Sequence, residues 1–299
     1  MRLAAALPNM AGGSLAGIVA TAAAAEDLGW ESVWVADHIL VDNASASQYG
    51  HAFEALETLA FVAGRFRRVG IGTAVLVVPM RDPVVLARQL ATLDLLSEGR
   101  LTVGVGVGWV AGEFRNLGAA DRFGRRGVLL DEALRLWRHL WSGSQEPFEG
   151  RFTQLVDFAF APVPPQGDRI PIWVGGSSPA ALRRASTADG YIATRTDAAQ
   201  LAERVALLDE MSVANGRGRP IIAARVAVTG EELAAPDEVR ARIAAYGEAG
   251  ADLLIVGLPG SPPDEVSDRL RLIDGVRQAL VEDPPPARLR SQTTKRRYE

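Results

Sequence analysis

The chain has 299 residues, of which 48% are hydrophobic and 23% are charged, and its formal net charge is −4. This composition is typical of a globular protein with a large core, and the acidic balance disfavours nucleic acid as the main partner. The chain has no cysteine, which excludes disulfides, thiol nucleophiles and thiolate metal sites. No run of residues is apolar for long enough to span a bilayer, and Pro8 interrupts the short apolar run at the N-terminus. We therefore predict a cytoplasmic protein that has no membrane partner.

Short apolar runs alternate with amphipathic segments along the chain. The apolar runs predict strands at residues 2–7, 32–36, 69–78, 101–108, 170–176, 190–194, 220–228 and 251–258. Apolar residues at helical spacing predict helices at residues 15–28, 53–65, 83–98, 125–141, 179–188, 197–213, 236–249 and 264–281. Gly29 and Gly99 follow two of these helices, and Pro83 and Pro179 stand where two others begin, as is typical of helix ends and starts.

The order of these segments indicates the fold. They form eight strand-then-helix units, and such alternation implies crossover connections and a parallel sheet. A TIM barrel needs eight units in about 250 residues, whereas a doubly wound sheet usually has fewer strands. We predict an α/β fold, a single (β/α)8 TIM barrel over residues 1–282, with loop insertions at 39–52 and 143–168 that line its C-terminal rim. The Pro-rich and then basic segment 283–299 is predicted to be a polar, disordered tail.

Polar residues follow several of the predicted strands. Asp37 and His38 follow the second strand, Trp109 and Glu113 follow the fourth, and Arg195 follows the sixth. In a TIM barrel the active site lies where strands end and βα loops begin, so these residues are candidates for chemistry. His38 is a candidate acid or base because imidazole exchanges protons near neutral pH; a histidine that merely hydrogen-bonds its own loop is the alternative. No H-E-x-x-H or comparable ligand spacing occurs, so we predict no metal site.

The fifth predicted strand ends in the sequence GGSSP, residues 175–179. Two glycines let a ligand approach the backbone closely, and the N–H groups at a helix N-terminus attract anions. The turn is therefore a candidate phosphate site, and an ordinary capped helix start is the alternative.

The fourth predicted strand contains the sequence GVGVGW, with glycines at 104, 106 and 108. This spacing does not match the G-x-G-x-x-G fingerprint of dinucleotide-binding proteins. Glycines inside a buried strand indicate a close approach by something else. A planar ligand lying against the strand and tight packing of the barrel layers both explain them.

Four segments occur together in an order and spacing that resemble one known family. They are AEDLGWESVWVADHI, IGTAVLVVPMRDPVVLARQLATLDLLSEGRLTVGVGVGWVAGEFRNLG, LLDEALRLWRHLW and PIWVGGSSPAALRRASTADGYI. Together they resemble the bacterial-luciferase-like superfamily, and within it the branch of oxidoreductases that use the deazaflavin coenzyme F420. The resemblance extends from about Leu3 to Val281.

The resemblance implies a (β/α)8 barrel, often a homodimer, that holds a flavin or deazaflavin at its C-terminal rim. It implies that His38 lies near the reactive C5 carbon of the ring. It also implies that a strand bulge at Ala74 and Val75, often a non-proline cis peptide in the family, supports the back of the ring. The cofactor-binding residues that it implies are Asp37, His38, Thr73, Ala74, Val75, Gly106, Val107, Gly108, Val174, Gly175, Gly176, Ser177, Ser178, Thr194 and Arg195.

Trp109 departs from the pattern of one group within this family. The sugar-phosphate dehydrogenases of the family carry a glutamate directly after the glycines of the fourth strand, where this chain has Trp109. The departure argues against a sugar-phosphate substrate and indicates a substrate pocket that Trp109 lines with an aromatic ring. Glu113 is a second candidate catalytic residue, and anchoring of its own loop is the alternative.

Three functions are compatible with these features. The leading hypothesis is an F420-dependent oxidoreductase that transfers hydride between C5 of the deazaflavin and an unidentified small organic substrate, while His38 gives or takes a proton. The first alternative is an FMN-dependent monooxygenase that uses O₂, and the second is a non-catalytic flavin-binding protein. The expected partners are a small-molecule substrate and a second copy of the chain, and neither nucleic acid nor a membrane.

Overall fold

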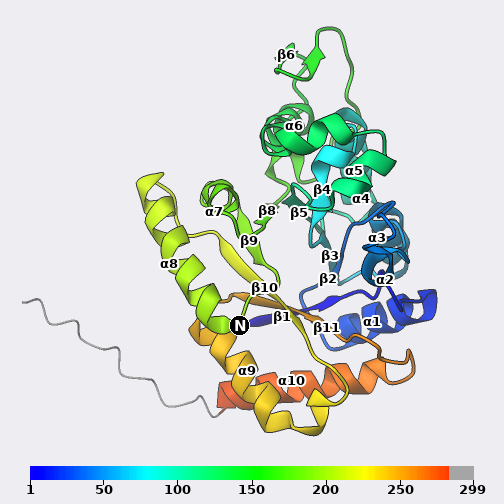
Figure 1. Ribbon diagram of the computed structural model, residues 1–299, viewed down its shortest axis with the longest axis vertical. Helices are drawn as coiled ribbons and strands as arrows, with labels where there is room; N and C mark the ends of the chain where they lie inside the picture. Colours follow the sequence, from blue (N-terminus) through cyan, green and yellow to red (C-terminus); the bar gives the residue numbers. More distant parts are fainter. Residues whose placement is uncertain (283–299) are drawn as a thin grey trace, which may run out of the picture.

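The structure of the chain, a computed structural model, describes residues 1–282, and the predicted tail at 283–299 lies outside the described residues. Nine strand segments form one sheet in the order β3-β2-β1-β11-β10-β9-β8-β5-β4, and a pairing between β3 and β5 closes the sheet into a barrel (Figure 1). All of these pairings are parallel. Because β3 and β4 are two parts of one interrupted strand, the barrel has eight staves. The predicted TIM barrel is confirmed.

The staves of the barrel are short and run in the same direction, so that their C-terminal ends share one rim. They are β1 (Arg2–Ala6), β2 (Ser32–Val35), β3 (Gly70–Thr73), β4 (Leu76–Val77), β5 (Leu101–Gly106), β8 (Ile172–Gly175), β9 (Gly190–Ala193), β10 (Ile221–Ala227) and β11 (Leu253–Gly257). We call the opening at this rim the mouth of the barrel.

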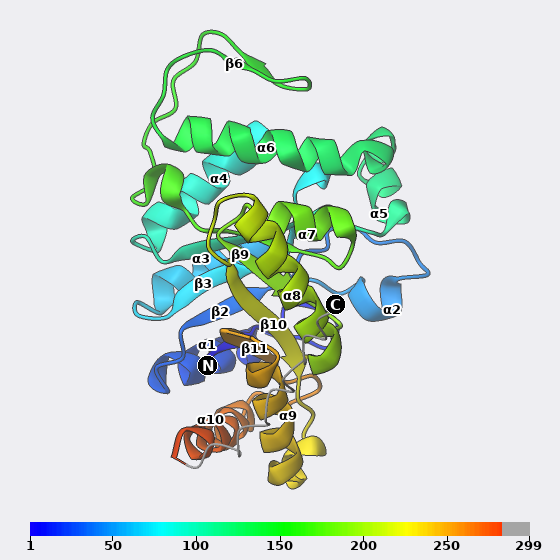
Figure 2. The same cartoon turned by 90° about the vertical axis from the view of Figure 1, so that its left-hand side faces the viewer.

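A helix follows each stave and lies outside the strands (Figures 1 and 2). These helices are α1 (Leu15–Asp27), α3 (Ala55–Arg65), α4 (Pro83–Leu96), α6 (Arg126–Trp141), α7 (Pro179–Ala185), α8 (Ala198–Ala214), α9 (Pro236–Glu248) and α10 (Val266–Glu282). Local sequence fixes several helix starts. Asp82 and Ser178 accept hydrogen bonds as N-caps, and each is followed by the proline that marks the predicted first turn. None of the helices in residues 1–282 has the length and apolar character needed to cross a bilayer.

Two tryptophans fill the inside of the barrel. The Trp34 and Trp173 rings lie 5.1 Å apart, within an interior cluster that includes alanines and isoleucines from other staves. A Cβ atom at Gly72 would lie 2.6 Å from the Trp34 ring, and one at Gly190 would lie 2.5 Å from the Trp173 ring. Glycine is therefore required at both positions for the rings to fit, and the interior is a packed core below the mouth.

The connections between staves and helices carry the remaining elements. These are α2 (Ala46–Tyr49), η1 (Val78–Met80), α5 (Ala111–Asn116), η2 (Ala120–Arg125), β6 (Phe148–Glu149), β7 (Gln154–Leu155), η3 (Gly167–Arg169) and η4 (Glu232–Ala234). The predicted insertion at 39–52 contains α2. The insertion at 143–168 contains the antiparallel hairpin β6–β7, which lies beyond α6 (Figure 1).

The hairpin β6–β7 is fixed to α6 by one carboxylate. Glu132 accepts hydrogen bonds from the N–H groups of Phe152, at 2.9 Å, and Thr153, at 2.7 Å. The hairpin lines a cleft of about 580 Å³ together with residues of η1, η2 and α6. This cleft does not include His38, so the two insertions line different parts of the molecule.

Candidate active site

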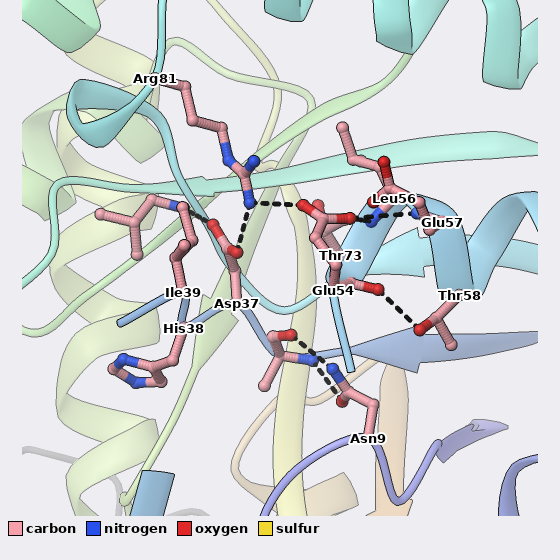
Figure 3. A network of polar contacts seen from close by, with 12 residues as sticks. Asn9, Asp37, His38, Ile39, Glu54, Leu56, Glu57, Thr58, Thr73 and Arg81 are labelled. Atoms are coloured by element: carbon pink, nitrogen blue, oxygen red, sulfur yellow. Dashed lines mark hydrogen bonds and ion pairs between the residues drawn. The ribbon is translucent and has the colours of Figure 1, made fainter. Parts of the chain in front are cut away.

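The pair Asp37 and His38 lies directly after β2. Asn9, which follows β1, fixes this turn: its side-chain nitrogen donates to the Ala36 carbonyl at 2.8 Å, and its side-chain oxygen accepts from the Ala36 N–H at 3.0 Å. Beyond this clamp the two side chains diverge. The Asp37 carboxylate points toward Arg81, whereas the His38 ring points away from it (Figure 3). One strand end therefore supplies two groups with different surroundings.

Asp37 is buried in a network of charged groups behind the mouth (Figure 3). Its carboxylate accepts from Arg81 Nη2 at 2.6 Å and from the Val77 N–H at 2.8 Å, and Arg81 also pairs with Glu54 at 2.8 Å. Burial raises the pKa of Asp37, while the Arg81 charge and the Val77 N–H act in the opposite direction. These bonds tie β2 to β4 and to the start of α3. Asp37 therefore supports the strands, and its contact with a cofactor stays a prediction.

His38 forms a dyad with Glu113 of α5. His38 Nδ1 lies 2.9 Å from Glu113 Oε2, and the two side chains are 10% and 2% exposed. Glu113 Oε1 also accepts from the N–H groups of Ile39, at 2.5 Å, and Leu40, at 3.3 Å. Glu113 therefore both anchors the loop after β2 and contacts the histidine.

The hydrogen bonds to Glu113 keep its carboxylate ionised. Burial raises the pKa of Glu113, but the bonds from His38 and from the Ile39 N–H outweigh it, so that the pKa lies below that of an ordinary glutamate. An ionised carboxylate accepts a hydrogen bond, so His38 Nδ1 carries a proton. This leaves His38 Nε2 to accept or donate a second proton, which is the arrangement that a general acid or base requires.

An aromatic lid covers His38 and is formed by Tyr49 of α2 and by Trp109. The centroid of the Tyr49 ring lies 4.2 Å from that of His38 and 5.8 Å from that of Trp109. Arg195, which follows β9, donates a hydrogen bond to the Tyr49 hydroxyl and lies over the Trp109 ring, with its Cζ 5.5 Å from the centroid. The φ angle of Arg195 is 51°, a left-handed conformation that is uncommon outside glycine. His38, Trp109, Glu113 and Arg195 thus meet at one place, as their positions after the strands predict.

Val75 forms a shelf beside this group, on the stave next to β2. The Ala74–Val75 peptide bond is cis, as the resemblance implies, and it separates β3 from β4. The Val75 side chain lies between two glycines: a Cβ at Gly106 would be 2.6 Å from Val75 Cγ2, and one at Gly175 would be 2.5 Å from Val75 Cγ1. Tight packing by the bulge therefore explains the glycine at 106.

Three further predicted cofactor residues lie close to the shelf. Thr73 is buried and donates a hydrogen bond to the Gly104 carbonyl at 2.7 Å, which joins β3 to β5. Val107 is partly exposed after β5. Gly108 has a φ of 76°, and a Cβ there would meet Val77 Cγ1 at 2.6 Å. These residues shape the backbone around Val75.

The other predicted cofactor residues lie after β8 and β9. Gly176 has a φ of 124°, and its carbonyl accepts from the Tyr191 hydroxyl at 2.9 Å. Ser178 caps α7 by accepting from the Ala181 N–H at 3.2 Å, as an ordinary capped helix start requires. Ser177 is exposed, Val174 is buried, and the Thr194 carbonyl accepts from the Thr196 hydroxyl at 2.9 Å. The phosphate site at this turn stays a prediction.

Tyr49 and Arg225 also lie at the mouth, and neither is among the site residues that the sequence predicts. Ile221 and Ala223 of β10 face the barrel interior, so Arg225, two residues further along the same strand, also faces inward. The signal was present: an arginine interrupts the apolar run IIAARVAV at an inward position. Tyr49 gave no signal beyond its place in an insertion.

A sequence profile described as luciferase-like monooxygenase matches residues 2–271. The chain belongs to this family. The match covers most of the barrel, from the first strand to the last helix, and it confirms the resemblance that the four sequence segments indicate.

Within the family, curated relatives include F420-dependent enzymes. An F420-dependent glucose-6-phosphate dehydrogenase of Amycolatopsis mediterranei is 37% identical over 180 residues, which cover 59% of this chain and 53% of the relative. An uncharacterised protein of Mycobacterium tuberculosis is 34% identical over 203 residues, which cover 67% of each chain. The chain thus spans about half the length of the dehydrogenases that it matches.

Solved structures with different cofactors share this fold. An F420-dependent secondary alcohol dehydrogenase, in complex with an F420–acetone adduct, has a TM-score of 0.78 and 18% identity, and the match covers 92% of this chain and 98% of that one. A type II Baeyer–Villiger monooxygenase of Pseudomonas putida, in complex with FMN, has a TM-score of 0.73 and 16% identity, with 93% and 96% covered. At such identities the likeness shows the fold alone.

Proposed function

We propose that this protein is an oxidoreductase that uses coenzyme F420 to exchange hydride with a small organic substrate. One observation carries the proposal: the His38–Glu113 dyad and the Val75 shelf lie at one mouth, on neighbouring staves of the barrel. The 37% identity to dehydrogenases that are named F420-dependent favours the deazaflavin as the cofactor.

The residues at the mouth fit a flat ring and a phosphate. Val75 is held in place by two glycines and is still partly exposed, so it offers an apolar surface to the face of a ring. The turn at Gly176 and Ser177 follows β8, which pairs with β5 beside the shelf. We assign the ring to the Val75 shelf and the phosphate to this turn, where glycine allows a close approach to the backbone.

In this proposal His38 transfers one proton to or from the substrate. A bound deazaflavin supplies a carbon centre, C5, that gives or takes hydride. When a substrate alcohol is oxidised, His38 Nε2 accepts the proton of the hydroxyl group; in the reverse direction it returns that proton to the carbonyl oxygen. The Glu113 carboxylate holds the imidazole in place through Nδ1. The Tyr49 and Trp109 rings limit the access of water to this proton.

An FMN-dependent monooxygenase is the second candidate. The Val75 shelf would also accept the ring of FMN, and a solved FMN complex has this fold. A non-catalytic flavin-binding protein is the third candidate, but it would have no need for a carboxylate that orients a histidine beside the shelf. The named relatives act on glucose 6-phosphate; the half-exposed Trp109 ring at this mouth favours a less polar substrate.

A fluorescence titration of the purified protein with F420 and with FMN tests the choice of cofactor. We expect F420 to bind at least about 10-fold more tightly than FMN, a difference of about 1.4 kcal/mol. Tighter binding of FMN would overturn the proposal in favour of the monooxygenase. Reduction of bound F420 by a panel of alcohols, followed by absorbance, then separates an enzyme from a binding protein.

A further inference from the structure

We propose that the mouth of the barrel binds a carboxylate group of the substrate between Arg225 and Arg195, beside His38. The inference names the substrate class of the site described above, so its link to hydride transfer rests on the proposed function. The anion site itself rests on the arginines and not on the identity of the cofactor.

Arg225 occupies an inward-facing position near the mouth end of the apolar strand β10. Its partner in the register of the sheet is Ile255 of β11, which belongs to the interior cluster. Ala223, two residues earlier on β10, is completely buried in the same cluster. The Arg225 side chain therefore faces the packed interior, where the buried side chains of the other staves are alanine, leucine, isoleucine and tryptophan.

Arg225 has no counter-charge in the part of the chain that the structure describes. Within residues 1–282 its side chain makes neither a hydrogen bond nor an ion pair. By contrast, Arg81 at the same rim pairs with both Asp37 and Glu54. Arg225 is partly buried, and even partial burial of a cation without a partner is costly, so an arginine in such a place indicates a ligand of opposite charge.

A second arginine adds to the positive charge. Burial lowers the pKa of Arg225, the charge of Arg195 lowers it further, and Tyr49 acts in the opposite direction. Arg195 itself contacts the Tyr49 hydroxyl and the Trp109 ring, and no carboxylate in residues 1–282. Two guanidinium groups on one side of the mouth, neither of which contacts a carboxylate within residues 1–282, form a site for an anion, and a carboxylate matches their planar geometry.

The position of Arg225 favours the substrate over the cofactor as the source of the anion. Around the barrel, β10 is separated from β3 by β2, β1 and β11 on one side and by β5, β8 and β9 on the other, so it lies opposite the Val75 shelf. The turn to which we assign the phosphate follows β8, and β9 lies between β8 and β10. Arg195, however, reaches His38 through a single ring, that of Tyr49. The aromatic lid then favours an apolar or aromatic body for the acid.

The experiment compares small acids with their neutral amides. The probes are acetate, propionate and benzoate, and the matched acetamide, propionamide and benzamide, added to the full-length protein with and without F420. Binding is followed by tryptophan fluorescence, because Trp109 lies at the site, and by the rise in Tm. We expect at least one acid to bind the wild-type protein on the order of 10-fold to 100-fold more tightly than its amide, as expected of hydrogen bonds to a charged group.

Two variants localise the effect. Arg225→Gln is expected to remove the preference for the acid, whereas Arg217→Gln, at an exposed position in the loop before β10, removes one positive charge and is expected to keep it. Arg225→Gln should fold, because it removes a charge that lacks a partner, and its Tm without ligand should be no lower than that of the wild-type protein. Equal binding of acids and amides by the wild-type protein, or an unchanged preference in Arg225→Gln, would overturn the inference.

A further arm separates the substrate from the cofactor. F420 and its deazariboflavin core, which has the same ring but no phosphate and no glutamates, are titrated against the wild-type protein and Arg225→Gln. For each protein, the Kd of the phosphate-free compound is divided by the Kd of F420. If the substrate supplies the anion, this ratio is the same in both proteins. A ratio that falls about 10-fold or more in the variant would assign Arg225 to the cofactor and overturn the inference. The preference for acids can hold even if FMN replaces F420, so its failure and that of the proposed function are distinguishable.

Discussion

The two sides of the mouth differ in how their charges are balanced. On the side of β2, β3 and β5, which we call the paired side, Asp37 contacts Arg81 and Glu113 contacts His38. On the side of β9 and β10, the open side, Arg195 contacts a hydroxyl group and an aromatic ring, and Arg225 has no hydrogen bond or ion pair within residues 1–282. Charges that are paired fix the position of groups, whereas charges without a partner are expected to meet a ligand.

The aromatic lid joins the two sides. Tyr49 stacks on His38 of the paired side and accepts a hydrogen bond from Arg195 of the open side. A substrate that is held by the open side would therefore lie against the histidine of the paired side. This arrangement separates substrate binding from proton transfer, and substitutions on the two sides should have different consequences.

The largest effect is expected from His38 on the paired side. His38→Ala should lower kcat by on the order of 10²-fold or more, because it removes the group that moves the proton. F420 affinity should change little, since the Val75 shelf is intact. The measurement is steady-state reduction of F420 with the best alcohol of the panel. His51→Ala is the matched control, because His51 is exposed and its ring lies against Phe53, away from the dyad; an equal loss in both variants would contradict a catalytic role for His38.

A substitution of Asp37 tests whether the ion pairs of the paired side stabilise the fold. Asp37→Asn leaves Arg81 with Glu54 as its one carboxylate partner within residues 1–282 and should lower the free energy of unfolding by about 3 to 5 kcal/mol, the cost of breaking a buried ion pair. Urea denaturation measures it. Asp121→Asn removes an exposed partner of Arg125 and should cost less than about 1 kcal/mol. Similar losses in the two variants would show that the buried ion pair of Asp37 stabilises the protein no more than the exposed pair of Asp121.

Gly106 tests the packing of the shelf. Gly106→Ala places a Cβ 2.6 Å from Val75 Cγ2 and should destabilise the protein by about 1 to 3 kcal/mol. Adding Val75→Ala removes the colliding methyl groups, so the double variant should recover part of that loss in a double-mutant cycle. Gly64→Ala is the control, because no atom lies within 4 Å of a Cβ there. Strictly additive effects in the cycle would mean that Val75 is not the reason for the glycine.

The sequence predicts the barrel and the paired side better than the open side. Eight alternating segments, glycines after helices and prolines at helix starts each leave a local signal, and each segment falls close to its predicted bounds. His38 and Glu113 could be placed after strands that end at the same rim, but their contact depends on the fold of α5, which no local pattern fixes. The lid could not be foreseen, because Tyr49 reaches His38 only through the path of the insertion after β2. The role of Arg225 could not be predicted, because the sequence does not show that its side chain faces the barrel interior; the register of β10 with β11 shows this.

The smallest effect concerns the charge of Glu113. Its pKa is lower in the folded protein than the ordinary value of about 4.3, so the ionised carboxylate contributes stability in full above that value and loses it as the pH falls through the lower, folded pKa. Glu113→Gln lacks this contribution, which should be about 1 kcal/mol, the net worth of a typical hydrogen bond. The difference in unfolding free energy between the wild-type protein and the variant should therefore shrink as the pH falls below about 4.3. A difference that does not change with pH would mean that the charge of Glu113 does not contribute to the stability of the dyad. The contact between Glu113 and His38 would then depend on packing and not on ion pairing.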